Sequence, residues 1–222
     1  MFTLIRSVAG SHLYGLDHAE SDEDIMGIGI ATKAEKLGLD TIEQLGQDDE
    51  VTYELAKWTR LAIKGNPTVL QMLWTPTSMW QLWDDRWPEM QIRLRATVLS
   101  DRCRDAFLGY MKGQRIKLER DRGQRTELKE QFGYDTKFAA HMIRLGIQGV
   151  EVLTTGQMSL LMASGSRQLC RDIRQGRYTE PEVLEMANEL EEKLKTVPSV
   201  LPPTVDRVKV NNFLVDTYTE WW

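Results

Sequence analysis

The feature that most constrains this chain is a change of pattern before its middle. From Ile92 to Leu194 apolar residues recur at helical spacing, and the run is interrupted mainly by glycines. Before it, short apolar and β-branched segments alternate with turns. This order predicts an α/β (α+β) fold, in which residues 1–95 form a domain with a small mixed sheet and residues 96–222 form a helical domain.

The first 95 residues contain three predicted strands, at residues 2–9, 22–30 and 49–55. The first strand ends at Gly10-Ser11, and Ser11 is a suitable N-cap for a short helix over residues 11–18. Further along, helical periodicity from Tyr53 to Ile63 is broken by Asn66-Pro67. A last amphipathic helix is predicted over residues 204–221.

Composition limits the partners and the compartment of the chain. Its 222 residues carry a net charge of -5, so contact with nucleic acid requires a local basic surface. Only two cysteines are present and neither has a partner at metal-ligand spacing, which indicates reduced thiols. The short apolar run at the N-terminus is interrupted by Arg6, and no run approaches the roughly 18 apolar residues that span a membrane. We therefore expect a cytoplasmic protein without membrane contact; its oligomeric state is left open.

Acidic residues cluster around the second and third predicted strands. Side chains alternate between the two faces of a strand, so Asp22 and Asp24 are expected on one face and Glu23 on the other. Two neighbouring carboxylates repel unless a cation lies between them, and Mg²⁺ suits such an oxygen site. A third carboxylate from the neighbouring strand, in the run Asp48-Asp49-Glu50 or at Glu54, would allow two ions to bind.

The turn after the first strand has the residues of a phosphate site. Gly10 allows a tight turn beside a bulky ligand, and Ser11 offers a hydroxyl and backbone N–H groups to a polyphosphate. Alone, a Gly-Ser pair is typical of a plain turn and a D-x-D pair of a solvated loop. Their order, with eleven residues from Ser11 to Asp22, favours a joint site for phosphoryl or nucleotidyl transfer.

These motifs resemble a known family. The segment GSHLYGLDHAESDEDIMGI resembles the G-S…D-x-D signature of polymerase-beta-type nucleotidyltransferases, especially the predicted nucleotidyltransferases of the RNA repair pathway DNA polymerase beta family. The similarity continues in DDEVTYELAKWTRLAIKGNPTVLQMLW and YDTKFAAHMIRLGIQGVEVLTTG, and more faintly in LPPTVDRVKVNNFL. It implies a polymerase-beta-like catalytic domain, a helical partner domain, Mg²⁺ (or Mn²⁺) and a nucleoside triphosphate such as ATP.

The resemblance also implies roles for individual residues. Gly10 and Ser11 match the turn that holds the triphosphate, and Asp22 and Asp24 match the metal carboxylates. Asp49 fits best as the third carboxylate, with Glu50 and Glu54 as alternatives in other registers. One departure follows Asn66-Pro67, where the family usually has a glutamate and this chain has Gln71.

Basic residues elsewhere are secondary candidates for phosphate binding. Lys137, His141 and Arg144 are spaced by four and three residues, so they share one helical face that could hold the triphosphate or the acceptor. The alternative is a solvated face with His141 bonded to a carbonyl. Lys57, beside the third strand, could also reach phosphate.

The pattern favours an enzyme that moves a nucleoside monophosphate onto an acceptor hydroxyl and releases pyrophosphate. A catalytically inactive nucleotide-binding module of the same fold is the alternative, and a phosphohydrolase is a third hypothesis. An RNA or DNA end, a protein side chain and a small molecule all remain open as acceptors.

Overall fold

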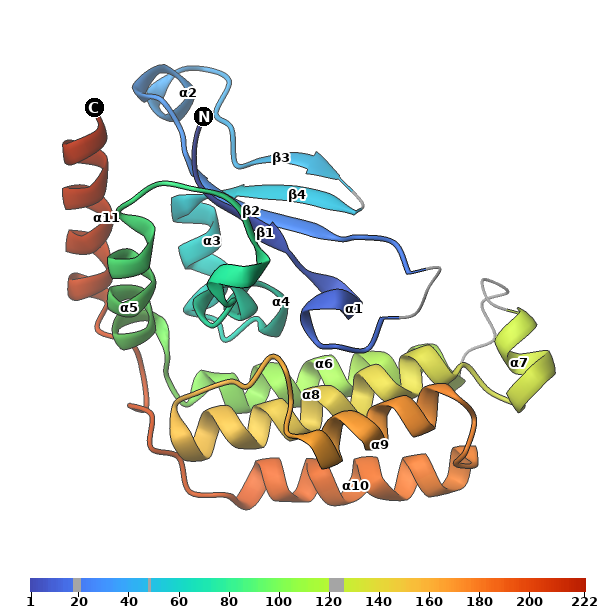
Figure 1. Cartoon of the computed structure of the whole chain (residues 1–222). Coiled ribbons are helices and arrows are strands. Elements are labelled where there is room, and N and C mark those ends of the chain that lie inside the picture. The colour runs from blue at the N-terminus through green and yellow to red at the C-terminus, as the bar shows by residue number, and fades with distance from the viewer. Residues whose placement is uncertain (18–20, 48, 120–125) are drawn as a thin grey trace. The chain divides into compact units, whose positions relative to one another are not determined.

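The computed structural model describes residues 1–17, 21–47, 49–119 and 126–222, and it divides into two compact units (Figure 1). Unit 1 comprises Met1–Ser100 together with Pro202–Trp222, and unit 2 comprises Asp101–Leu201. Unit 1 contains a sheet and unit 2 contains helices, which confirms the predicted α+β class.

A mixed five-stranded sheet forms the centre of unit 1, in the order β3-β4-β2-β1-β5. Strand β1 is antiparallel to both β2 and β5, β2 is parallel to β4, and β3 is antiparallel to β4. The strands span β1 (Phe2–Val8), β2 (Ile25–Ile30), β3 (Gln44–Gln47), β4 (Glu50–Glu54) and β5 (Trp80–Trp83). The three predicted strands correspond to β1, β2 and β4.

Both edge strands were missed by the sequence reasoning. Strand β3 has the sequence QLGQ and is exposed throughout, so its apolar pattern carries no strand signal. Strand β5, WQLW, follows Pro76 and is also largely exposed. Backbone pairing with β4 and β1 defines these strands, and pairing partners distant in sequence leave no local periodicity.

Short helices follow the strands of unit 1. Helix α3 (Leu55–Ala62) begins directly after β4, where the Glu54 carboxylate accepts from Ala56 N at 3.0 Å and caps it. Asn66 caps α4 (Pro67–Leu70) through Thr68 N at 2.9 Å, with Pro67 at the first helical position. A 3₁₀ turn, η1 (Gln71–Leu73), continues from α4 into the core. The other helices of this unit are α1 (Gly10–Leu13), α2 (Lys33–Leu37), η2 (Thr77–Met79), α5 (Trp87–Val98) and α11 (Arg207–Trp221).

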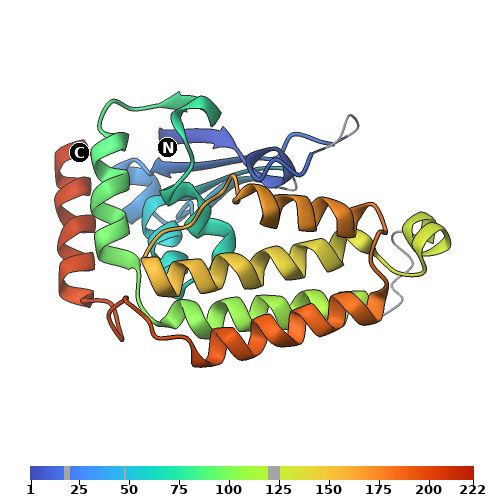
Figure 2. The same cartoon turned by 60° about the horizontal axis from the view of Figure 1, so that its bottom comes forward.

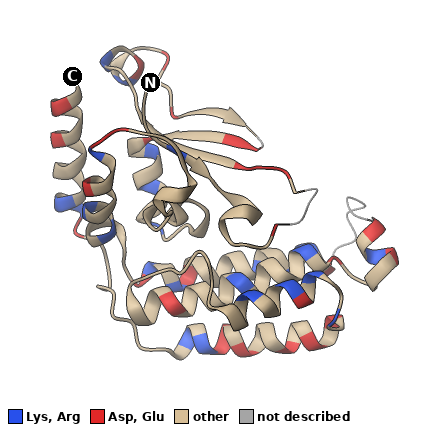
Figure 3. Cartoon of the chain, viewed as in Figure 1, with Lys and Arg blue, Asp and Glu red and all other residues tan. Residues whose placement is uncertain are grey.

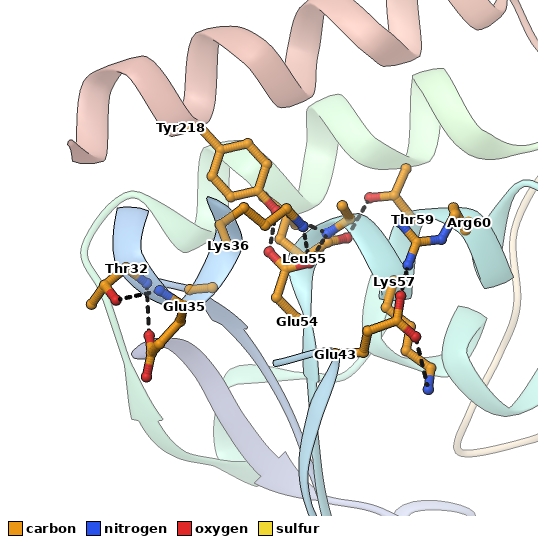
Figure 4. Close-up of polar contacts among 12 residues, drawn as sticks. Thr32, Glu35, Lys36, Glu43, Glu54, Leu55, Lys57, Thr59, Arg60 and Tyr218 are labelled. Atoms are coloured by element: carbon orange, nitrogen blue, oxygen red, sulfur yellow. Dashed lines mark hydrogen bonds and ion pairs between the residues drawn. The ribbon is translucent and has the colours of Figure 1, made fainter. Parts of the chain in front are cut away.

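The C-terminal helix α11 belongs to unit 1, and a buried polar cluster bonds it to β4 and α3 (Figure 4). The fully buried Glu54 carboxylate accepts from Lys36 Nζ at 2.6 Å and from the Tyr218 hydroxyl. The Tyr218 oxygen in turn accepts from Ala56 N at 3.2 Å. The sequence prediction placed residues 96–222 together, whereas the compact units divide after Ser100 and return Pro202–Trp222 to the sheet unit.

Unit 2 is a group of helices around α8 (Thr136–Thr155), against which the others pack (Figure 2). Helix α8 carries a continuous buried face and ends at Gly156, which has a left-handed φ of 68°. Cys103 and Cys170 are both buried in this unit. The remaining helices are α6 (Arg102–Glu119), α7 (Thr126–Phe132), α9 (Ser164–Arg174) and α10 (Glu180–Thr196).

Among the described residues, no helix combines the length and apolar character that crossing a membrane requires.

Candidate active site

The turn after β1 is bonded directly to the segment that precedes β2. Ala9 N donates to Asp24 O at 2.8 Å, and Gly10 then opens α1 with a φ of 59°. The N-cap of α1 is Ala9, without a side-chain cap, so the predicted N-cap role of Ser11 is wrong. The helix starts at Gly10 instead, and the φ of that residue lies in the left-handed region that favours glycine. Ser11 is half-buried in the first turn, and its carbonyl accepts from Leu16 N at 2.9 Å.

The Asp24 side chain lies close to Gly10, on the side where a side chain of residue 10 would project. A Cβ built on Gly10 would lie 1.7 Å from Asp24 Oδ2 and 2.6 Å from Asp24 Cγ. The Asp24 carboxylate therefore occupies the space that every other residue at position 10 would fill. The two halves of the predicted motif, the Gly-Ser turn and the D-x-D pair, meet at this contact.

The D-x-D segment itself lies just before the strand. The predicted strand began at Asp22, whereas β2 begins at Ile25, because the partner strand β1 ends its pairing at Val8↔Ile25. Asp22 and Glu23 are exposed and Asp24 is half-buried. Glu23 accepts from Gln81 Nε2 of β5 at 2.9 Å, which directs its carboxylate to the edge strand.

The parallel pairing of β2 with β4 brings Asp49 beside Asp24. Ile25 N donates to Asp49 O at 2.6 Å, and the register pairs Ile25 with Glu50. One position back along both strands, Asp24 and Asp49 are neighbours at the end of the sheet where β2 and β4 begin. Figure 3 shows acidic positions gathered at this end of the sheet.

The alternatives to Asp49 have other partners in the structure. Glu50 forms an ion pair of 2.8 Å with Arg6. Glu54 pairs with Gly29, five register positions from Asp24, which is about 16 Å along a strand. Its buried carboxylate caps α3 and binds Lys36 and Tyr218. Asp48, the remaining acid of this run, lies outside the described residues.

The donor chemistry at this end of the sheet suits a hard divalent cation. Carboxylate oxygens are the ligands that Mg²⁺ prefers, and it usually keeps water and substrate phosphate in its shell. In the part of the chain that the structure describes, no three His, Cys, Asp or Glu side chains converge into a metal-ligand group. Close approach is shown between the Asp24 carboxylate and Gly10, and between the backbones of Asp49 and Ile25.

Lys57 lies away from these carboxylates. It follows the end of β4 opposite Asp49, in the first turn of α3. Its ammonium donates to Gln44 Oε1 at 3.0 Å and lies 3.7 Å from Glu43, which also binds Arg60 (Figure 4). These contacts give Lys57 a role in tying α3 to β3.

The sequence profile of the RNA repair pathway DNA polymerase beta family matches residues 2–209. The chain belongs to this family. No curated protein gives a significant match. The family assignment confirms the resemblance drawn from the motifs and makes the chain a polymerase-beta-like nucleotidyltransferase at the level of the family. The matched range includes the Gly-Ser turn, the D-x-D segment and all of unit 2.

The matched range of the family also includes the basic residues of α8 in unit 2. Arg144 is buried and donates to Gln148 Oε1 at 2.7 Å. His141 is half-buried, and its pKa is held well below the usual range by burial, followed by the charges of Arg144, Lys117 and Lys137. Burial and the nearby charges of these three residues on α6 and α8 therefore favour the neutral form of His141. This matches the predicted shared face of Lys137, His141 and Arg144, and adds Lys117 to it.

An open pocket of about 480 Å³ lies elsewhere in unit 1, between α5 and α11. Arg93, Lys209 and Phe213 are among its lining residues, and none of the predicted site residues lines it. The pocket is thus separate from the acidic end of the sheet.

Proposed function

We propose that this family member catalyses magnesium-dependent transfer of a nucleoside monophosphate from a nucleoside triphosphate to an acceptor hydroxyl. The observation that carries the proposal is the Asp24 carboxylate lying in the space left by the absent side chain of Gly10. Phosphoryl-type transfer depends mainly on positioning and on neutralising phosphate charge, and this contact joins a phosphate-binding turn to an acidic group.

The metal would be held by Asp22, Asp24 and Asp49, whose carboxylates would have to draw together around Mg²⁺ or its substitute Mn²⁺. When bound, the cation neutralises charge on the phosphates and draws the triphosphate to the carboxylates. Asp49 is preferred over Glu50 and Glu54 because those two carboxylates are engaged by Arg6 and by the Lys36–Tyr218 cluster.

The chain's own groups have distinct roles in this reaction. Gly10 and Ser11 bind the triphosphate through backbone N–H groups and the serine hydroxyl. Asp49 orients the acceptor hydroxyl and takes its proton as the new oxygen–phosphorus bond forms at the α-phosphorus. The bond from that phosphorus to the bridging oxygen breaks, and pyrophosphate leaves. Within unit 2, Lys137 would supply a positive charge and His141 a neutral imidazole for hydrogen bonds to acceptor phosphate, whereas Arg144 is buried against Gln148.

The acceptor that we favour is the end of an RNA or DNA strand. The net charge of -5 suits a short contact with a strand end better than a long backbone footprint. With only two cysteines, the sequence has no disulfide framework, which fits a reducing compartment, and we place the reaction in the cytoplasm on that ground.

The test is a panel of α-labelled nucleoside triphosphates incubated with Mg²⁺ and with total RNA, DNA or protein. Label transfer with pyrophosphate release is expected for the wild type, and its loss for Asp22→Asn combined with Asp24→Asn. Glu23→Gln is the matched control, because it removes a charge from the same segment but from a side chain that binds Gln81.

Two results would contradict the proposal. Full transfer by the double variant would exclude these aspartates from the reaction. Saturable nucleotide binding by the wild type without transfer to any fraction would favour the inactive nucleotide-binding module.

A further inference from the structure

Three buried residues, Tyr14, Gln71 and Met26, are linked by two hydrogen bonds close in sequence to Gly10 and Asp24. The Tyr14 hydroxyl donates to Gln71 Oε1 at 2.6 Å, and Gln71 Nε2 donates to Met26 Sδ at 3.6 Å. All three residues are buried, with 6%, 4% and 5% of their surfaces exposed. A glutamine amide in such surroundings is kept only where its polar atoms find partners.

Tyr14 and Met26, the two outer residues of this hydrogen-bonded series, belong to the two halves of the candidate site. Tyr14 is the C-cap residue of α1, the short helix that starts at Gly10. Met26 lies in β2, two residues beyond Asp24. Gln71 therefore connects the phosphate-binding turn to the acidic segment from inside the core.

Gln71 is itself held in place by neighbouring backbone contacts. Its carbonyl accepts from Thr75 Oγ1 at 3.0 Å. The next residue, Met72, has its carbonyl bonded to Gln91 Nε2 at 2.9 Å. Helix α5 thus bonds to the backbone of η1 beside Gln71, whereas the bond to Tyr14 is made by the Gln71 side chain itself.

We propose that Gln71 is a positioning residue that holds α1 against β2 through Tyr14 and so sets the spacing between the Gly10-Ser11 turn and Asp24. This inference rests on the proposed nucleotidyl transfer for its functional consequence. The short α1 has four residues and no side-chain cap, so its own hydrogen bonds fix it weakly. The Tyr14–Gln71 bond supplies the constraint from outside the helix.

Three variants separate this role from general stability. Tyr14→Phe removes only the hydroxyl, Gln71→Met removes the acceptor at similar length, and Gln71→Glu retains an oxygen that Tyr14 can bond. Gln91→Met is the matched control: it removes a buried glutamine amide of the same core, bonded to the Met72 and Thr75 carbonyls, and leaves the acceptor of Tyr14 in place.

The first measurement is amide hydrogen exchange in residues 10–16, which include the bond from Leu16 N to Ser11 O. Tyr14→Phe and Gln71→Met should each speed exchange there by about tenfold, and the double variant no further, because both lose one shared bond. Gln71→Glu and Gln91→Met should leave exchange in this segment near the wild-type rate.

The second measurement is steady-state transfer, in which the two variants should lose about tenfold in kcat/KM while Gln71→Glu recovers most of it. The inference is overturned if exchange in residues 10–16 is unchanged in Tyr14→Phe and Gln71→Met, or if Gln91→Met speeds it equally. A wild-type protein that transfers no nucleotide contradicts the proposed function alone, since the exchange measurement still decides the role of Gln71.

Discussion

Replacing Gly10 by alanine gives the sharpest test of the candidate site. The new Cβ would lie 1.7 Å from Asp24 Oδ2, 2.6 Å from Cγ and 3.0 Å from Cβ, so the carboxylate must leave its place. The φ of 59° adds the strain of a left-handed conformation, about 1–2 kcal/mol for an L residue. Because the Asp24 side chain can rotate away, we expect the free energy of unfolding to fall by little more than this strain.

The activity should fall much further than the stability. A loss of about 1–2 kcal/mol lowers the melting temperature by roughly 2–8 °C in a chain of this size. Displacing a carboxylate by an ångström or more is expected to lower kcat/KM by about 100-fold. Thermal unfolding and the label-transfer assay on the same preparation measure the two effects.

Gly133→Ala provides the matched control, because Gly133 has a φ of 83° but a Cβ there would meet no atom within 4 Å. It should show the same backbone strain with unchanged transfer. The reasoning is refuted if Gly10→Ala retains transfer within a few-fold of the wild type, or if Gly133→Ala loses transfer to the same extent.

Three further predictions concern the rest of the chain. Tyr218→Phe should lower the free energy of unfolding by about 1–3 kcal/mol in urea titration, since it removes a hydroxyl donor to the buried Glu54; unchanged stability would contradict that role. His141 should titrate well below pH 6.5 by NMR. Because the unfolded chain then binds more protons than the folded one, the free energy of unfolding should fall as the pH drops below 6.5. A titration at pH 6.5 or above would contradict this description of its surroundings. Burial raises the pKa of Cys170 to about 11, and Cys103 is also buried, so a thiol reagent at pH 8 should label both cysteines only after denaturation; rapid labelling of the native protein would contradict this.

Local sequence patterns were sufficient to predict the three central strands of unit 1 and the start of α4. The apolar runs gave β1, β2 and β4, and Asn66-Pro67 marked the start of α4 as an N-cap followed by a proline. These signals succeed because each depends on residues within one or two turns of one another. The start of β2 was misplaced by three residues, since it is set by where β1 stops pairing.

The candidate site was predicted in part from the order of its motifs. Gly10, Asp24 and Asp49 could be named because the family resemblance fixed their types and order. The resemblance favoured Asp49 over Glu50 and Glu54; the structure places Asp49 beside Asp24 in the parallel register of β2 and β4 and pairs Glu50 with Arg6. The link from Tyr14 to Gln71 spans 57 positions and has no sequence signal.

What the sequence by itself determined is the class of the fold, the family and the identities of the acidic and glycine-serine motifs. Only the tertiary structure decided that Glu54 is buried beneath Tyr218, that residues 202–222 return to the sheet unit, and that Asp24 fills the space beside Gly10. The physical reason is that periodicity and capping are local properties of the backbone. Burial and close approach depend on residues that only folding brings together.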